Sequence, residues 1–326
     1  MGVQFSQVFP PRPSFPLEKL PSQKGKVFIV TGATSGIGFK VAEILYAKGG
    51  KVYVAGRSQK KGQDAIEAIQ RTAVPQSDGE GALEFLLLNL DDLASIMDSA
   101  NVFRSKESRL NVLINNAGVS QPPLGSVSKQ NHELQLATNC LGPFLLTKLL
   151  QPLLYAAVPD SAPGTVRVVW TSSQVAELSS PPEGMIMSEL TNPPNDNVRN
   201  YVNSKLGNWF LSIEMARRYG ADQRIVSVAQ NPGAANTNLL RNAKWMKILS
   251  RPLLHSAELA AHTVLYAALS DDLTLDNNGA YVIPWGRIHD QVAPKLATAM
   301  RLKEDGGTGL AKEFWEFCDE KTRDFC

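Results

Sequence analysis

The chain has 326 residues, a length that suits one large α/β domain with extensions better than two separate domains. Its 33 Lys and Arg residues against 31 Asp and Glu residues give a formal net charge of +2, which excludes a polycationic surface for nucleic acid and an acidic tail. The composition, 43% hydrophobic and 20% charged, excludes a disordered or fibrous chain and predicts a soluble globular protein.

The first segment, residues 1–23, is expected to form a Pro-rich N-terminal arm. Its prolines are Pro10, Pro11, Pro13, Pro16 and Pro21. Proline does not fit a helix interior or a central strand, which excludes the arm from the sheet. Phe5, Phe9 and Phe15 are apolar enough to dock on a surface, so we expect the arm to lie on the domain.

Beyond the arm, short β-rich apolar runs alternate with stretches of helical spacing. The expected strands are residues 26–31, 51–55, 83–88, 110–115, 166–171, 224–229 and 279–283. The clearest helices are residues 37–48, 131–158 with a break at Gly142-Pro143, and 201–219. Strands that alternate with helices predict a parallel sheet covered on both faces. We predict a single doubly wound, Rossmann-type α/β domain over residues 24–290 with a seven-stranded parallel sheet, and a helical tail over 291–326.

The cysteines and the N-terminus bear on the compartment. Cys140, Cys318 and Cys326 form neither a paired framework nor a Cys/His metal spacing, so we expect free thiols and no bound metal. The first 26 residues lack the basic and then apolar layout of a signal peptide, and no run of 18 apolar residues occurs. The sequence therefore predicts a cytoplasmic protein with no integral membrane segment.

A glycine-rich sequence, TGATSGIG from Thr31 to Gly38, stands between the first expected strand and the first expected helix. Gly32, Gly36 and Gly38 allow a tight turn, close approach of the backbone to a pyrophosphate, and close packing of helix on sheet. The other candidate contacts in this loop are Thr34, Ser35 and Ile37. The motif predicts a dinucleotide-binding loop, although a glycine-rich turn that binds nothing has the same composition.

The end of the second expected strand indicates which dinucleotide binds. NAD-binding units usually place an acidic residue there, on the ribose 2′-hydroxyl. This chain has Gly56 and Arg57 instead, and a guanidinium can pair with a 2′-phosphate that a carboxylate would repel. The sequence therefore favours NADP(H) over NAD(H). Ser35, Ser58 and Lys61 could assist, although Lys61 is equally a solvated helix charge.

The sequence YVNSK places Tyr201 and Lys205 four residues apart, on one face of a helix. An ammonium near a phenol favours the phenolate and lowers the tyrosine pKa, which suits a general acid or base. Alone this spacing is weak, because a surface tyrosine above a solvated lysine is the usual case. Other polar residues strengthen it.

Two polar segments follow expected strands, at the sheet edge where ligands of open α/β folds bind. Ser172 and Ser173 follow the strand at 166–171, and NNAG follows the strand at 110–115. Asn139 is a polar residue inside an apolar helix, where it can satisfy a backbone carbonyl at the helix break. That structural role is compatible with a catalytic one.

In this order and at this spacing, five motifs resemble those of the short-chain dehydrogenase/reductase family. They are TGATSGIG at 31–38, NNAG at 115–118, the serine pair at 172–173, YVNSK at 201–205 and NPGAANT at 231–237. The resemblance covers about residues 24–290. The stretch LNLDDLASI, the long Ser-to-Tyr interval and the helical tail look most like the retinol-dehydrogenase-like branch, and the FSQVFPPRP arm looks like its fungal members.

The resemblance implies catalytic roles for four residues. Tyr201 would donate or accept the proton, and Ser173 would hold the substrate oxygen. Lys205 would lower the tyrosine pKa and bind the nicotinamide ribose, while Asn139 would hold the helix break and a water that relays protons. Ser173 is preferred over Ser172 because the active serine of the family is usually the second of the pair.

The resemblance also implies where the cofactor lies. The adenosine side would be lined by Asn115, Asn116, Ala117 and Gly118. Asn89 and Leu90 would lie near the adenine, where the family more often has Asp in place of Asn89; an amide still offers a donor and an acceptor. Pro232, Gly233 and Thr237 would close over the nicotinamide.

The implied reaction is hydride transfer between NADP(H) and a carbonyl or alcohol of an apolar small molecule, with ketone reduction in fungal secondary metabolism as the expected role. A substrate lid is expected at 238–256, whose apolar residues could equally pack in the core or at a dimer contact.

Two alternatives remain at this stage. One is a non-catalytic NADP(H)-binding scaffold that acts through protein partners, and the other is a peripheral-membrane retinoid or sterol dehydrogenase that docks through Phe5, Phe9 and Trp245. The chain could be a monomer or a homodimer, since the helices at 131–158 and 201–219 could form a dimer interface or be covered by the tail.

Overall fold

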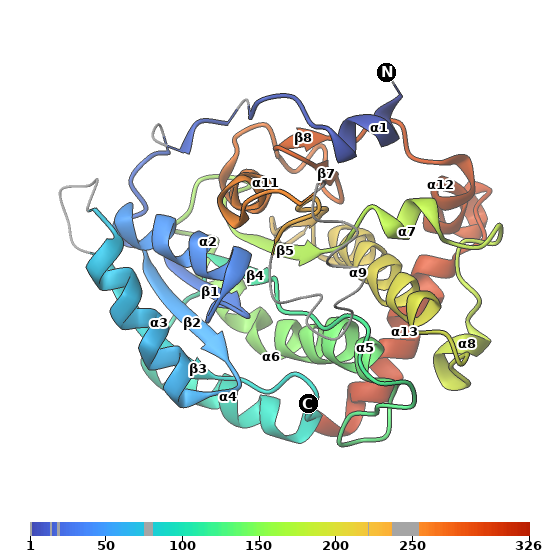
Figure 1. The fold of residues 1–326 in the computed structure, drawn as a ribbon, viewed down its shortest axis with the longest axis horizontal. Coiled ribbons are helices and arrows are strands. Elements are labelled where there is room, and N and C mark those ends of the chain that lie inside the picture. The colour runs from blue at the N-terminus through green and yellow to red at the C-terminus, as the bar shows by residue number, and fades with distance from the viewer. Residues whose placement is uncertain (1, 14, 18–19, 75–80, 221, 237–253) are drawn as a thin grey trace.

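Figure 1 shows the computed structural model, which describes residues 2–13, 15–17, 20–74, 81–220, 222–236 and 254–326. In these residues the strands form one sheet of eight, in the order β3-β2-β1-β4-β5-β6-β7-β8. The strands are β1 (Val27–Thr31), β2 (Lys51–Gly56), β3 (Ala82–Leu87), β4 (Val112–Asn115), β5 (Arg167–Thr171), β6 (Val226–Gln230), β7 (Tyr281–Ile283) and β8 (Arg287–Ile288). All neighbouring pairs from β3 to β7 are parallel. The predicted Rossmann-type fold class is confirmed.

The predicted count of seven strands is wrong by one short edge strand. β8 pairs antiparallel with β7, Ile288 opposite Val282 and Arg287 opposite Ile283. It follows a tight turn in which the Gly286 N–H donates to the Ile283 carbonyl over 3.0 Å. A strand of two residues has too few positions to show a periodic pattern, so no sequence signal marks it.

Helices connect the strands and cover both faces of the sheet. Their bounds are α1 (Val3–Val8), α2 (Gly36–Ala47), α3 (Gln59–Thr72), α4 (Leu93–Lys106), α5 (Leu134–Leu136), α6 (Gly142–Ala157), α7 (Val175–Leu178), α8 (Ser188–Thr191), α9 (Asn197–Tyr219), α11 (Ala257–Leu269), α12 (Pro294–Met300) and α13 (Leu310–Thr322), with 3-10 turns at Lys303–Asp305 and Arg323–Phe325. The core below one face packs α4, α6 and α9, with α13 outside them. The core on the other face packs α2, α3 and α11.

Sequence patterns explain the inner elements. All five residues of β1 and of β5 are buried, as their continuous apolar runs predict for strands covered on both sides. Side-chain caps start α3 at Ser58 and α9 at Asp196, each accepting from backbone N–H groups of the first turn. The helix break expected at Gly142-Pro143 is wrong: helical structure continues from Leu134 to Ala157, and a π-helical turn, Ala137–Leu141, joins α5 to α6.

The N-terminal segment contains a helix that the proline pattern does not predict. Residues 3–8 precede the first proline and form α1, which lies beside β8 and α7 in Figure 1. Further along, Phe15 packs edge-on against Tyr266 of α11, with ring centroids 5.5 Å apart. Leu17 and Leu20 are buried in the α11 side of the core. The arm therefore contributes to the core as well as to the surface.

The helical tail packs against α6 and α9. Phe314 lies so close to α9 that a Cβ on Gly207 would be 2.4 Å from its ring. Trp315 packs edge-on against Phe144 of α6, with ring centroids 4.8 Å apart. Lys148 of α6 pairs with Asp319 of α13 at 2.6 Å. The helices considered above as a dimer interface are therefore covered by α13.

One helical stretch among the described residues, Leu134–Ala157, is long and apolar enough to cross a membrane by length and composition alone. Most of its apolar window is buried inside the protein, and it contains the core residues Phe144, Leu145 and Leu150. These are the properties of a core helix.

Candidate active site

The glycine-rich loop between β1 and α2 has the backbone that its sequence requires. Gly32 and Gly36 have positive φ angles of 67° and 61°, which favour glycine. A Cβ on Gly32 would lie 2.9 Å from Ala117 Cα, and one on Gly38 would lie 2.6 Å from Asn116 Nδ2. The loop can therefore pack against the NNAG segment only as glycine.

Hydrogen bonds join that loop to the end of β4. The Thr31 hydroxyl accepts from the backbone N–H groups of Asn116 (3.0 Å) and Ala117 (2.9 Å), and the Asn116 side chain donates to the Thr31 carbonyl (2.8 Å). Ser35 is exposed at the N-cap of α2, where no side chain caps the first N–H groups. This helix N-terminus at the carboxyl edge of the sheet suits the pyrophosphate of a dinucleotide.

The structure corrects the position expected for Asn115 on the adenosine side. Its side chain is 3% exposed and donates to the Thr147 hydroxyl of α6 over 3.1 Å. Successive side chains of a strand point to opposite faces of the sheet, and the Asn115 side chain points to the face that α6 covers. Leu90 is also buried. Its backbone packs against the start of α6, where a Cβ added at Gly142 would lie 2.4 Å from the Leu90 carbonyl oxygen.

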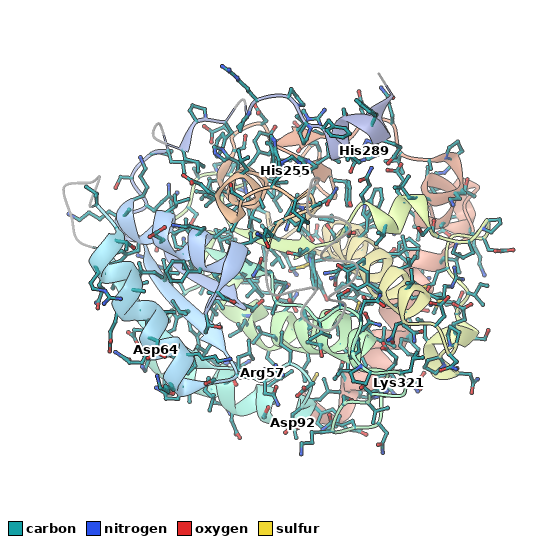
Figure 2. All side chains as sticks on the ribbon, viewed as in Figure 1. Arg57, Asp64, Asp92, His255, His289 and Lys321 are labelled. Carbon is teal, nitrogen blue, oxygen red and sulfur yellow. The ribbon has the colours of Figure 1, made fainter. Side chains whose placement is uncertain are left out.

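Arg57 and Asn89 lie near the β3 edge of the sheet, and β8 forms the other edge. They follow β2 and β3 and line a hollow of about 460 Å³, together with Asp91. Arg57 is exposed and forms no ion pair with any residue that the structure describes. Figure 2 shows it well apart from His255 and His289. Its guanidinium is therefore available for a phosphate at this end.

The two serines after β5 have different surroundings. The buried Ser172 hydroxyl donates to the Lys205 carbonyl of α9 over 2.7 Å, so it holds the helix against the strand. The partly exposed Ser173 side chain lies close enough to the Tyr201 phenol to lower the pKa of that phenol. Only Ser173 is thus free to share a ligand oxygen with Tyr201.

Lys205 lies beside Tyr201 in a buried position. Its ammonium donates to the Thr171 carbonyl (3.0 Å) and lies 5.6 Å from the centre of the Tyr201 ring. Burial lowers the pKa of Lys205 to about 8. Burial also raises the pKa of Tyr201, and the nearby Ser173 side chain lowers it by a smaller amount. Desolvation of the phenolate therefore has the larger effect on the tyrosine pKa, and the lowering by Lys205 stays a prediction.

Asn139 lies in the π-helical turn and ties three segments together. Its carbonyl oxygen accepts from the Val119 N–H (2.8 Å), and its amide donates to the Val119 carbonyl (3.0 Å) and the Ser204 hydroxyl (2.9 Å). The carbonyl that it satisfies lies in the loop after β4, whereas the sequence predicted one at a helix break. A Cβ on Gly118 would lie 3.1 Å from Asn139 Oδ1 and 3.4 Å from Lys205 Nζ, so this glycine opens the space between the two side chains.

The NPG segment after β6 lies under residues from β7 onwards. Pro232 is buried, and Gly233 has a φ of 78°. A Cβ on Gly233 would lie 3.2 Å from both Pro284 and the Trp285 ring. Thr237 and residues 238–253 of the expected lid lie outside the described residues, but His255 bridges to Asn236 (2.9 Å) and Ala234 (2.7 Å) through its backbone.

Comparison with known proteins identifies the family. Residues 26–184 match the family model described as short chain dehydrogenase. A short-chain dehydrogenase/reductase of Phomopsis amygdali is 43% identical over 98% of this chain and 96% of its own length. The one named iacJ from Pestalotiopsis fici is 42% identical over 97% and 96%. The chain belongs to the short-chain dehydrogenase/reductase family.

Solved structures share the fold of this short-chain dehydrogenase/reductase. A protein of Mycobacterium paratuberculosis, described as uncharacterised, is 28% identical over 94% of this chain and 97% of its own, with a TM-score of 0.67. RhlG of Pseudomonas aeruginosa in an NADP active-site complex is 22% identical over 81% and 95%, with a TM-score of 0.62. That second likeness shows the fold alone.

Some residues of the site escape motif-based reasoning in this short-chain dehydrogenase/reductase. Asn208 shares the Thr171 carbonyl with Lys205, donating over 2.9 Å. It stands three residues after Lys205, so a polar residue on the buried face of α9 is the signal that could have found it. Gln4, Gln7 and Glu177 also lie beside the site, and their separation along the chain gives no such signal.

Proposed function

We propose that this chain transfers a hydride between NADP(H) and a carbonyl or alcohol carbon of an apolar small molecule, with ketone reduction as the working direction. The observation that carries the proposal is the convergence of Ser173, Tyr201 and Lys205, with Asn139 behind them, at the carboxyl edge of the sheet. The glycine loop with its helix N-terminus lies at the same edge, and its glycines leave room for a dinucleotide backbone.

The cofactor, when bound, supplies the hydride from its nicotinamide ring. The chain's own residues act on the substrate oxygen. Ser173 would donate a hydrogen bond to that oxygen, and Tyr201 would give it a proton. The protonated phenol is the form of Tyr201 that would donate this proton. Lys205 would hold positive charge beside the phenolate that forms.

Arg57 is the basis for NADP(H) in this proposal. It is exposed, and it has no ion-pair partner in the described part of the chain. The residues directly after β2 are Arg57 and Ser58, so no acidic residue stands there. A guanidinium in that setting favours a 2′-phosphate. Of the similar structures, two contain NADP and one, a reductase of Brucella melitensis, contains NADH, so the family fold accepts either.

A titration without substrate tests the proposal. Purified protein is titrated with NADPH and separately with NADH, and nicotinamide fluorescence is followed. We expect tight binding of NADPH and weaker binding of NADH. Equal affinities would contradict the role of Arg57, and binding of neither would contradict the function. The loss of NADPH absorbance on addition of apolar ketones then tests the substrate class. We connect the reaction to fungal secondary metabolism because the relatives are fungal.

A peripheral-membrane enzyme is a second candidate, favoured by one observation. Phe5 and Phe9 of the arm are 50% and 53% exposed, and their ring centroids are 5.0 Å apart. An exposed aromatic pair of this kind can enter a lipid interface. Trp245 lies outside the described residues. Co-sedimentation with liposomes tests this candidate, and an unpelleted protein would favour the cytoplasmic location.

A further inference from the structure

Helix α1 docks on the protein in an unusual way. Its two phenylalanines, Phe5 and Phe9 at its end, are half exposed, whereas Gln7 is 2% exposed. A buried amide costs free energy unless its donors and acceptors are paired, so the docked position depends on specific partners more than on apolar area. Figure 1 places the helix over the β7–β8 end of the sheet.

The partners of α1 lie on both sides of the proposed nicotinamide position. Gln174, the residue after Ser173, donates to the Gln4 carbonyl over 2.8 Å. On the other side, Asn231 at the start of the NPG segment donates to Gln7 Oε1 over 2.8 Å. The contacts join residues that are 170 and 224 positions apart in the chain.

The amides of these residues form a directed chain. The Glu177 carboxylate can only accept, so the Gln4 amide nitrogen must face it. Gln4 Oε1 then accepts from both Gln174 Nε2 (3.2 Å) and Gln7 Nε2 (3.4 Å). The second bond turns Gln7 Oε1 toward the Asn231 amide nitrogen. Asn231 Oδ1 is thereby left to accept from the Gly233 N–H over 3.0 Å. Each amide fixes the orientation of the next.

The start of this chain is itself held firmly. Both Glu177 oxygens lie 3.2 Å from His289 Nε2, and Glu177 also accepts from the Ala293 N–H over 3.1 Å. Although burial raises the pKa of Glu177, the hydrogen bonds from His289 and Gln4 lower it overall, which keeps the acceptor charged. Figure 2 shows His289 on the side of the molecule where α1 lies.

A second set of contacts connects α1 to the other end of the NPG segment, at residues 234–236. The His255 ring donates to the Val8 carbonyl over 3.1 Å, and the His255 backbone pairs with Ala234 and Asn236. Arg287 of β8 donates to the Ser6 carbonyl (2.8 Å) and hydroxyl (3.1 Å). Residues 231–236 therefore contact α1 directly at Asn231 and through His255 at their other end.

We infer that α1 is a positioning element of the active site, in which Gln4 and Gln7 set the Asn231–Gly233 segment that covers the nicotinamide. The inference rests on the proposed function for the role of that segment, which the family resemblance alone assigns. It predicts a split between the two halves of the cofactor. Loss of the amide chain should weaken binding of the nicotinamide half and leave the adenosine half unchanged.

The experiment compares Gln7→Leu with wild-type protein and with Gln63→Leu, a matched control on the exposed face of α3. Calorimetry measures binding of NADPH and of 2′,5′-ADP, which carries only the adenosine half. We expect Gln7→Leu to weaken NADPH about fivefold, as for loss of one net hydrogen bond, and to change 2′,5′-ADP less than twofold. Equal weakening of both ligands, or of neither, would overturn the inference.

A double-mutant cycle tests the route through Asn231. In an Asn231→Ala background, Gln7→Leu should have no further effect on NADPH binding, whereas additive effects would contradict the amide chain. If Gln7→Leu fails to fold by thermal melting, Gln4→Met breaks the chain one step earlier and should give the same split. Gln4 is only partly buried, so this change is milder.

Amide hydrogen exchange separates this inference from the proposed function. In unliganded Gln7→Leu, exchange should accelerate in residues 231–236 and stay unchanged in the glycine loop at 31–38. This readout needs no cofactor. If wild-type protein binds neither ligand, the proposed function fails, yet accelerated exchange confined to 231–236 would still support positioning by α1. Unchanged exchange there would refute it.

Discussion

At the β3-β2-β1 end of the sheet the site is built from local segments, whereas at the β6-β7-β8 end it is built from distant ones. The glycine loop lies directly between β1 and α2, and Arg57 directly follows β2. At the other end, Arg287 contacts Ser6 across 281 positions. The comparison teaches that the residues proposed to bind the adenosine half of the cofactor directly follow single strands, while the segment proposed to cover the nicotinamide is held by contacts from the N-terminal helix.

Phe314→Ala should give the largest effect and tests how far the reacting end depends on the tail. The ring is fully buried against Gly207 of α9, so its removal leaves a cavity under the helix that carries Tyr201 and Lys205. We expect the free energy of unfolding to fall by about 3–4 kcal/mol, measured by urea denaturation. Val198→Ala, at an exposed site on the same helix, is the control and should change it by less than about 1 kcal/mol. A small loss for Phe314→Ala would mean that α13 is not needed there.

Tyr201→Phe tests the reacting end directly. It removes the transferable proton, so turnover should drop on the order of 100-fold or more. NADPH affinity should stay nearly intact, since the glycine loop and Arg57 are untouched. Stopped-flow or steady-state kinetics with a reducible ketone gives the first number and fluorescence titration the second. Retained turnover would refute Tyr201 as the acid.

Arg57→Glu tests the local end. A carboxylate beside the 2′-phosphate should weaken NADPH relative to NADH by roughly 2–3 kcal/mol. Lys60→Glu, on the neighbouring exposed turn of α3, controls for the change in surface charge. The two affinities come from the same fluorescence titration. An unchanged preference would show that another residue contacts the phosphate.

The pH dependence of reduction should be the smallest effect. Because burial lowers the pKa of Lys205 to about 8, its ammonium is present below that pH and is lost above it. Turnover should therefore be level below about pH 8 and fall up to about tenfold per pH unit above it. A pH–rate profile at saturating ketone measures this. A rate that rises above pH 8 would contradict the need for a charged lysine.

Much of the fold could be predicted because its signals are local. The apolar runs of β1 and β5 and the glycine loop at 31–38 each depend on a few consecutive residues. The two-residue strand β8 and the six-residue helix α1 are too short to show a period, and their positions are fixed by contacts with Val282, Asn231 and Arg287.

The site followed the same rule. Tyr201, Lys205 and Ser173 stand in a recognisable order, and the structure brings them together at one edge of the sheet. Sequence reasoning did not find that burial raises the tyrosine pKa, because burial cannot be read from a five-residue motif. It also missed Gln7, whose role depends on an asparagine more than 200 positions away.

The packing of α13 on α6 and α9 has a consequence for assembly. A second copy could reach the covered faces of these helices only after Phe314 and Trp315 had left them. Burial of this surface within one chain is a unimolecular event, so dilution does not oppose it, unlike burial between subunits. The contribution of this packing to the free energy of unfolding should accordingly be independent of protein concentration.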